Sequence, residues 1–338
     1  MNIVYTFDDG YSAISAVSIL SLLKSNQKVK EITIVIVDCG ITKENREKLI
    51  NLVKSYNRNI VFVDGTGMEK KIPVELELSY WSFVCYVRLF FSELLPDFDR
   101  VLHVDCDTLI EGELETVYNL KLDNGKISAA AYDCLPTAKY AANMKITDKY
   151  YSSGIILFDL KAMRLENIQQ KFVDYIVEKK GKLPHLDQDV FNVVLKDRIM
   201  TLPIEYNLMT QTVLFGEKSN KFFSSNEPYY TTQEIKKGLA SPILYHLVGF
   251  RYVSKPWAQP CYHPLNHKWL DYYCSLDFDP ERKIIKYKNK KFGILRELIC
   301  FIWNFCYKIP VLQIFEFWLE KKRVRKKCRE LNEIRGER

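Results

Sequence analysis

Glu31-Ile-Thr-Ile-Val-Ile-Val-Asp38 is a short run of mostly β-branched apolar residues that ends in an acid. Such a run predicts a strand buried on both faces of a sheet. The pattern repeats on both sides, because residues 2–7 and 59–64 predict two more strands, and residues 12–24 and 42–56 have helical spacing, with Thr42 as the expected N-cap. This order predicts an α/β fold with a mixed, mostly parallel sheet flanked by helices on both faces.

The rest of the body continues to alternate strand and helix signals. We expect a helix over about 80–95 that carries Arg88, helices over 161–179 and 188–196, and strands over 127–133, 154–160 and 243–249. Ligands bind such sheets at the carboxyl ends of the strands, and the first three predicted strands end in Asp8-Asp9, Asp38 and Asp64.

A pair of acids follows another apolar run, Arg100-Val-Leu-His-Val-Asp105-Cys-Asp107-Thr-Leu-Ile110. On an extended chain Asp105 and Asp107 point the same way and can share one hard divalent cation with phosphate oxygens, whereas Cys106 points into the core. A solvated strand end is the other interpretation of an isolated Asp-x-Asp.

Composition and charge narrow the function classes. The chain has 338 residues and 47% hydrophobic content, enough for one large enzyme domain with an appendage. Residues 281–338 hold 17 Lys and Arg against 7 Asp and Glu, whereas residues 1–280 hold 32 against 35, so the body lacks the basic patch of a nucleic-acid binder. Nine cysteines without paired spacing favour reduced thiols in a cytosol, and the start of the chain predicts no export.

The basic end therefore forms a second unit, with residues 1–280 as the catalytic domain and 281–338 as an amphipathic helical tail. Apolar residues recur at helical spacing from Phe292 to Ile309, Pro310 breaks or kinks this stripe, and residues 311–319 give a second apolar piece before the cluster Lys321–Lys327. This pattern favours a tail that lies on the inner face of an anionic membrane without crossing it. A tail that packs on the catalytic domain or on a second subunit, in a homo-oligomer, is the alternative.

Six motifs identify a family resemblance: Phe7-Asp-Asp-Gly-Tyr11, Tyr86-Val-Arg-Leu89, His103-Val-Asp-Cys-Asp107, Tyr151-Ser-Ser-Gly-Ile-Ile-Leu157, Asp187-Gln-Asp189, and His246-x-x-Gly249 before Lys255-Pro-Trp257. In this order, over roughly residues 1–275, the chain resembles glycosyltransferase family 8, which includes bacterial lipopolysaccharide and lipooligosaccharide galactosyl- and glucosyltransferases. The resemblance implies a GT-A fold, a UDP-hexose donor, Mn²⁺ with Mg²⁺ as the alternative, and retention of anomeric configuration.

The resemblance also implies residue roles. The metal ligands are Asp105, Asp107 and His246, and the catalytic pair is Gln188 with Asp187. The nucleotide-sugar contacts are Thr6, Asp8, Gly10, Tyr11, Arg88, Asp105, Cys106, Asp107, Asp133, Ser152, Ser153, Asp187, Gln188, Gly249 and Lys255. The sequence departs from the family pattern at three places. Gly10 stands where the family commonly has Asn, and Ser152 and Ser153 replace a common Asn-Ala or Asn-Ser. The spacing from Gly249 to Lys255 is longer than usual, which leaves Arg251 as an alternative phosphate-binding cation.

These residues favour one mechanism over another. An amide is a poor nucleophile, so Gln188 predicts attack by the acceptor on the face from which UDP departs. Double displacement with Asp187 as nucleophile stays open. The acceptor is a glycan, glycolipid or glycoprotein. We expect the variable loops of this chain that bind the acceptor near residues 73–80 and 211–235.

Two other classes compete with a glycosyltransferase. Haloacid-dehalogenase-type phosphatases also use an apolar strand that ends in Asp-x-Asp, but Leu109 occupies the position where they carry Thr or Val, and Thr108 falls one residue early. A membrane-surface protein that binds a nucleotide sugar without turning it over would not need Asp187, Gln188 and His246.

Overall fold

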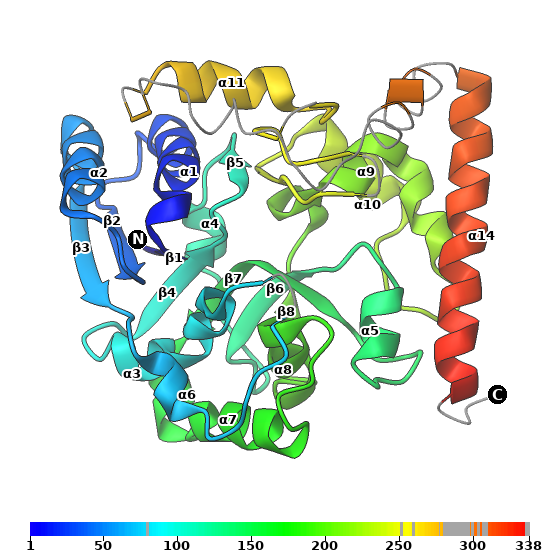
Figure 1. Cartoon of the computed structure of the whole chain (residues 1–338), viewed down its shortest axis with the longest axis horizontal. Coiled ribbons are helices and arrows are strands. Elements are labelled where there is room, and N and C mark those ends of the chain that lie inside the picture. The colour runs from blue at the N-terminus through cyan, green and yellow to red at the C-terminus, as the bar shows by residue number, and fades with distance from the viewer. Residues whose placement is uncertain are drawn as a thin grey trace.

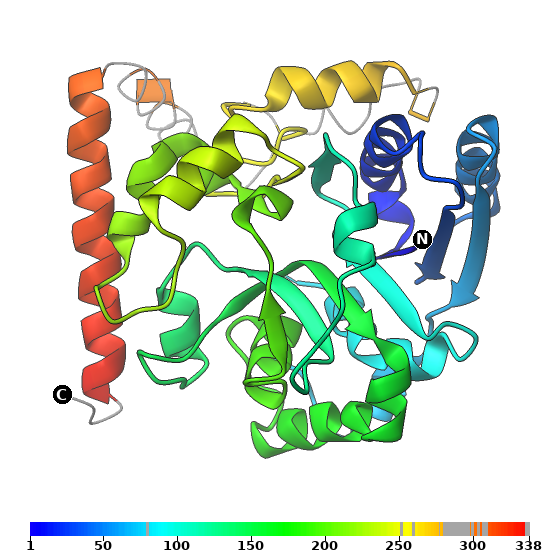
Figure 2. The same ribbon diagram turned by 180° about the vertical axis from the view of Figure 1, so that it is seen from behind.

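A computed structural model describes residues 1–78, 81–250, 253–258, 261–276, 278–279, 298, 301–302, 305 and 310–334. A large twisted sheet crosses the molecule, helices cover its faces, a smaller layer lies above it, and α14 runs along one side (Figure 1). The same arrangement seen from behind places the N-terminus and α14 toward opposite sides of the molecule (Figure 2).

The large sheet has seven strands in the order β3-β2-β1-β4-β7-β6-β8. Its strands are β1 (Asn2–Phe7), β2 (Thr33–Asp38), β3 (Asn59–Asp64), β4 (Arg100–Val104), β6 (Ser128–Tyr132), β7 (Tyr151–Asp159) and β8 (Ile199–Thr201). Only β7 runs antiparallel to its neighbours β4 and β6, and the other pairs are parallel. The predicted mixed, mostly parallel sheet is confirmed.

Helices cover both faces of this sheet. On one face, a hydrophobic core packs beneath α1 (Ser12–Ser25), α2 (Lys43–Ser55) and α11 (Asn266–Cys274). On the opposite face, a second core packs beneath η3 (Phe83–Phe90), α3 (Phe91–Leu94), α6 (Leu160–Leu165), α7 (Ile168–Glu178) and α8 (Leu186–Val194). Thr42 caps α2 as predicted, since its hydroxyl accepts the Asn45 N–H at 3.3 Å.

A second sheet has the order β5-β10-β9, built from β5 (Thr108–Ile110), β10 (Leu244–His246) and β9 (Leu208–Met209). The expectation that Asp105 and Asp107 lie on one extended strand was therefore wrong, because the chain leaves the large sheet after Val104 and enters the small one at Thr108. The predicted strand over 243–249 also stops early, at His246, where the chain makes a tight turn in which Val248 N–H donates to the His246 carbonyl at 2.9 Å.

Several predicted helices and strands need other boundaries. Residues 83–90 form a 3₁₀-helix before the short α3, so the expected regular helix over 80–95 was wrong, and Tyr80 lies outside the described residues. Asn167, with φ 50°, divides the helix predicted over 161–179. α8 begins and ends two residues earlier than predicted, and β7 begins at Tyr151 instead of Gly154.

The remaining described elements were not predicted. They are η1 (Asp9–Tyr11), η2 (Met68–Lys71), α4 (Glu115–Tyr118), α5 (Thr137–Ala141), η4 (Ile204–Tyr206), α9 (Thr210–Phe215), η5 (Gly216–Phe222) and α10 (Thr232–Ala240). The region 211–235, predicted to be an acceptor loop, is thus largely helical.

The tail contains α14 (Pro310–Ile334), which starts at the proline predicted to break the apolar stripe. Its inner face joins a hydrophobic cluster that includes Val324, Cys328 and Phe215, and Arg325 donates to the carbonyls of Lys221 and Phe223. Most of the stripe from 292 to 309 lies outside the described residues. Among the described helices, none combines the length and the apolar character that a membrane span requires.

Candidate active site

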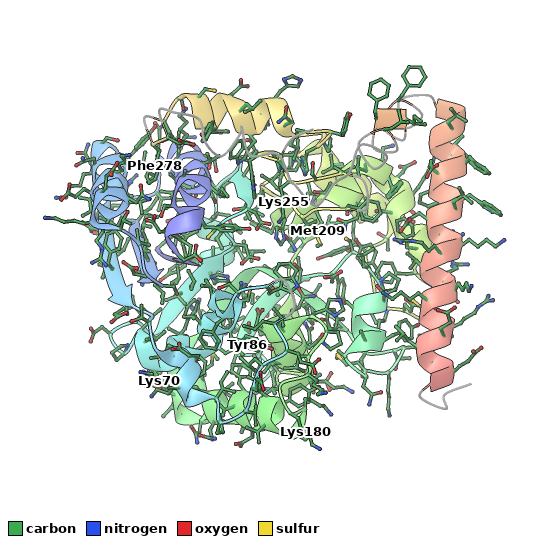
Figure 3. All side chains as sticks on the ribbon, viewed as in Figure 1. Lys70, Tyr86, Lys180, Met209, Lys255 and Phe278 are labelled. Carbon is green, nitrogen blue, oxygen red and sulfur yellow. The ribbon has the colours of Figure 1, made fainter. Side chains whose placement is uncertain are left out.

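The candidate site lies where the two sheets meet. The turn after β4 carries Asp105 and Asp107, β10 ends in His246, and both β7 and α8 begin beside them. Figure 3 labels Lys255 and Met209 near the middle of the molecule, between the large sheet and the layer above it. The carboxyl end of β4 therefore opens into this junction, as the position of ligand sites on α/β sheets predicts.

Three potential metal ligands converge there. Ligand atoms of Asp105, Asp107 and His246 lie within 4.8 Å of one another. His246 Nε2 is 3.3 Å from Asp107 Oδ1 and 3.6 Å from Asp105 Oδ2, and all three residues are largely buried. The two acids come together through a turn between strands of different sheets, so the predicted pairing holds although its predicted cause, alternation along one strand, does not.

Asp105 is fixed by two further side chains. Its Oδ1 lies 2.9 Å from Arg88 Nη2 and 3.1 Å from His103 Nε2. Burial opposes ionisation, but Arg88 and the bond to His103 outweigh it and lower the pKa of Asp105 to about 2. Burial beside Arg88 also lowers the pKa of His103 to about 4, so the ring is neutral and its Nε2–H donates.

Asp107 is paired with a cation on the opposite side. Lys255 Nζ contacts Asp107 Oδ2, and the Lys255 ammonium lies over the Trp257 ring at 5.8 Å from its centre. Burial again opposes ionisation, while Lys255 and His246 lower the pKa of Asp107 well below its usual value. The predicted alternative cation, Arg251, lies outside the described residues.

Arg88 connects the acidic turn to α8. The side chain is buried, its Nη1 donates to the Ser153 carbonyl at 2.7 Å, and its Nε lies 3.1 Å from Asp187 Oδ2. Burial raises the pKa of Asp187 to about 7, since Arg88 offsets it only in part and Asp105 adds a like charge. The sequence-based inference that Arg88 is not a free surface cation is confirmed.

Gln188 is held by both ends of its amide. Its Oε1 accepts the Ser153 N–H at 2.9 Å, and its Nε2 donates to Asp133 Oδ2 at 3.0 Å and to the Tyr150 hydroxyl at 3.2 Å. Asp189, beyond it, accepts from the Tyr150 hydroxyl at 2.6 Å. This network holds Gln188 in one orientation beside Asp133.

Ser152 and Ser153 lie near the start of β7, beside Arg88 and Gln188. Ser152 is buried, and its hydroxyl accepts the Gly154 N–H at 3.2 Å. Ser153 joins the network through its backbone, which bonds Arg88 and Gln188, and the Gly154 carbonyl accepts the Asp105 N–H at 2.9 Å. The backbone of residues 153 and 154 therefore holds Arg88, Gln188 and Asp105 in place.

The other predicted contacts surround the end of β1. Thr6 is buried, Asp8 lies at the carboxyl end of the strand, and Gly10 and Tyr11 are exposed. Tyr11 makes an edge contact with Trp257 at 6.5 Å between ring centres. Cys106 belongs to the core, as predicted, with Sγ 3.5 Å from the Thr6 carbonyl, and Gly249 is exposed beyond His246.

Not every acid at a strand end belongs to the site. Asp9 Oδ1 accepts from the Thr42 backbone and hydroxyl, both at 2.8 Å, and so braces the start of α2. Asp38 accepts from the amides of its own loop and pairs with Arg46, and Asp64 accepts from Thr66. These acids stabilise loops.

Two buried residues of the site had no assigned role. His103 lies two residues before Asp105, so the same alternation rule that paired the acids could have found it. Asp189 stands in the Asp187-Gln-Asp189 motif, but its bonds to Tyr150 and to the His185 N–H depend on tertiary contacts.

Comparison with known proteins agrees with this geometry. The profile described as Glycosyl transferase family 8 matches residues 2–261. General stress protein A of Bacillus subtilis is 26% identical over 80% of this chain and 92% of its own length. Lipopolysaccharide 1,2-glucosyltransferase of Escherichia coli K12 is 28% identical over 80% of this chain and 74% of its own.

Solved structures agree on the fold. The crystal structure of the galactosyltransferase LgtC in complex with donor and acceptor sugar analogues matches with a TM-score of 0.70 at 23% identity, and covers 82% of this chain and 96% of that one. This likeness shows the GT-A fold, and the family match selects glycosyl transfer over the phosphatase and the non-catalytic alternatives. The chain belongs to glycosyl transferase family 8, and it is a glycosyltransferase.

Proposed function

We propose that this enzyme transfers a hexose, glucose or galactose, from a UDP-sugar to a glycan, glycolipid or glycoprotein acceptor with retention of configuration. The convergence of Asp105, Asp107 and His246 carries the proposal, because two carboxylates and an imidazole face one another beside two cations. A diphosphate needs such a mixture of metal ligands and positive charge.

The ligand set fits a divalent metal. The Nε2 atom of His246 faces both carboxylates, 3.3 Å from Asp107 and 3.6 Å from Asp105, as an imidazole ligand of a shared ion would. The low pKa values of Asp105 and Asp107 keep both carboxylates ionised and ready to bind a cation. One imidazole with two carboxylates suits Mn²⁺, with Mg²⁺ as the alternative. When bound, such an ion supplies Lewis-acid stabilisation of the departing diphosphate.

Lys255 is the proposed phosphate cation. Its ammonium contacts Asp107 and is partly exposed, so it can reach a phosphate oxygen next to the ligand set. Positive charge there would stabilise the negative charge that develops on the leaving phosphate. Tyr11, Asp8, Thr6 and Gly10 would line the nucleotide side.

Gln188 and Asp187 are proposed to steady the sugar. The amide of Gln188 is fixed by Ser153, Asp133 and Tyr150, which suits a group that orients a substrate and not one that attacks it. We therefore favour same-face attack by the acceptor, with the departing phosphate accepting the acceptor's proton. Asp187 as the nucleophile of a double displacement is the alternative.

Calorimetric titration tests the donor site. UDP should bind the wild-type protein with Mn²⁺ present and at least ~10-fold more weakly after chelation, because the diphosphate is held partly through the ion. His246→Ala should lose this metal dependence. UDP affinity that is equal with Mn²⁺ and with EDTA would contradict the proposed ligand set.

We also propose that the outer face of α14 places the enzyme on an anionic membrane at the cytoplasmic side, where a lipid-linked acceptor would be presented. Ile314, Phe315 and Trp318 are 57%, 54% and 52% exposed on this helix. A hollow beside them is lined by Trp318, Lys321, Lys322, Arg325, Lys326 and Arg329. Exposed aromatic groups next to cations are typical of helices at an anionic interface.

Vesicle sedimentation of the full-length chain tests this surface, since removal of α14 would expose the cluster beneath it. Each cation contributes about 1 kcal/mol near such a membrane, so Lys322→Glu with Lys326→Glu should release the protein from phosphatidylglycerol vesicles at low salt. Lys236→Glu with Lys237→Glu on α10 is the control. Failure of the wild-type protein to sediment with these vesicles would overturn the proposal and leave α14 as a packing element.

A further inference from the structure

Gly154 lies against the imidazole of His246. A Cβ atom at Gly154 would stand 2.2 Å from His246 Nδ1, 2.3 Å from Cε1 and 3.1 Å from Cγ. Its backbone is not in the left-handed region, so the glycine is not needed for conformational freedom. A glycine is needed here because the His246 ring occupies the space that a side chain would fill.

Neither partner can move away easily. His246 ends the central strand of the small sheet and is paired with Thr108 on one side and Met209 on the other. Gly154 is held in the large sheet, where its carbonyl accepts the Asp105 N–H at 2.9 Å. The contact therefore joins two sheets whose backbones are both fixed by hydrogen bonds.

The imidazole lacks the usual means of orientation. A metal-binding histidine normally donates its second ring N–H to a carbonyl or carboxylate, which fixes the ring. In the described part of the chain, His246 Nδ1 is buried without a hydrogen-bond partner, and this edge of the ring faces Gly154. Packing against the backbone of Gly154, which carries no side chain, therefore directs Nε2 toward Asp105 and Asp107.

We propose that Gly154 is a positioning residue for the metal site: its missing side chain sets where His246 Nε2 stands relative to the two carboxylates, and so sets metal affinity. This inference rests on the proposed function, in which these three residues bind the ion. A methyl group at 154 would displace the ring by about 1 Å, which is enough to spoil a ligand geometry.

The first test is Mn²⁺ titration of Gly154→Ala without nucleotide. We expect affinity to fall about 10- to 100-fold, the usual effect of losing support for a metal ligand. Gly238→Ala on α10 is the matched control, because its Cβ would crowd Ile204 Cγ2 at 2.6 Å, outside the ligand set. That variant should bind Mn²⁺ like the wild type, and wild-type affinity in Gly154→Ala would overturn the inference.

A double-mutant cycle then separates this contact from a general packing defect. Gly154→Ala should lower Tm in the wild-type background and leave Tm unchanged in the His246→Ala background, where the ring is gone. Equal losses of Tm in both backgrounds would show that residue 154 acts elsewhere and would overturn the inference. If the wild type binds no Mn²⁺, the proposed metal site fails, and the Tm cycle still decides whether the contact exists.

Discussion

Charges are arranged in opposite ways in two regions of the molecule. At the junction of the sheets, Arg88, Asp105 and Asp107 are each 8% to 19% exposed and paired at close range. On α14, Lys322, Lys326 and Arg329 are exposed, and the helix is attached to the body by its other face. Buried charges in this protein fix geometry, whereas exposed charges form a surface field.

The two arrangements have different energetic consequences. Removing one member of a buried pair leaves its partner uncompensated in a medium of low polarity, which is costly. An exposed pair is solvated and screened, and contributes little to stability. Substitutions at the junction should therefore affect both folding and chemistry, and those on the outer face of α14 should affect only what the protein contacts.

The largest expected effect is on catalysis at Asp107. Asp107→Asn keeps the shape but removes the charge that faces His246 and Lys255, so donor turnover should fall by about 1000-fold, as loss of a charge-stabilising group does. Glu111→Gln is the control, since Glu111 pairs with Lys268 outside the ligand set at 2.8 Å. Equal rates for the two variants, measured as UDP release, would show that Asp107 has no special role.

Arg88 should have the largest effect on stability. Arg88→Met leaves Asp105 and Asp187 buried without their shared cation, and should lower the free energy of unfolding by about 3–5 kcal/mol. Lys182→Met removes one partner of an exposed, solvated pair with Glu77 and should change the free energy of unfolding far less. Urea denaturation measures both. A loss of unfolding free energy for Arg88→Met as small as that for Lys182→Met would contradict the expected difference between buried and exposed charges.

Gln188 should affect chemistry with little change in folding. Gln188→Ala should slow transfer about 10- to 1000-fold, because the sugar loses an oriented amide but the reaction keeps its route. Mass spectrometry should detect no sugar attached to the protein. A covalent adduct on Asp187 would replace same-face attack by double displacement.

The smallest expected effect is a difference in stability between substitutions on the two faces of α14. Phe317 packs against Phe215 and Phe222 with ring centres at 5.4 and 5.1 Å, so Phe317→Ala should cost about 2–4 kcal/mol. Phe315 is 54% exposed, and Phe315→Ala should fall within about 0.5 kcal/mol of the wild type. Thermal unfolding compares them, and equal effects would mean that the inner face does not hold the helix.

The sequence predicted features that depend on local periodicity. The β-branched runs of β1, β2 and β3 and the N-cap at Thr42 were recognisable because strand and cap signals act over a few residues. Asp105 and Asp107 were recognised as a pair for the same reason, although a turn, and not a continuous strand, brings them together. The break at Asn167 was missed because an apolar stripe continues across it.

Contacts between distant segments could not be predicted in this way. The backbone bonds of this segment were not predicted, because only the folded chain shows that backbone groups of 153 and 154 bond Arg88, Gln188 and Asp105. The steric match of Gly154 to His246 likewise requires two sheets to be placed against each other. No pattern along the chain reports such a fit.

UDP release from UDP-glucose and UDP-galactose, with Mn²⁺ and with excess EDTA, tests the central claim most directly, because it needs no knowledge of the acceptor. The account predicts slow release from at least one donor in the presence of Mn²⁺, and loss of that release both on chelation and in Asp107→Asn. Undiminished release in excess EDTA would contradict the claim that Asp105, Asp107 and His246 hold a catalytic metal.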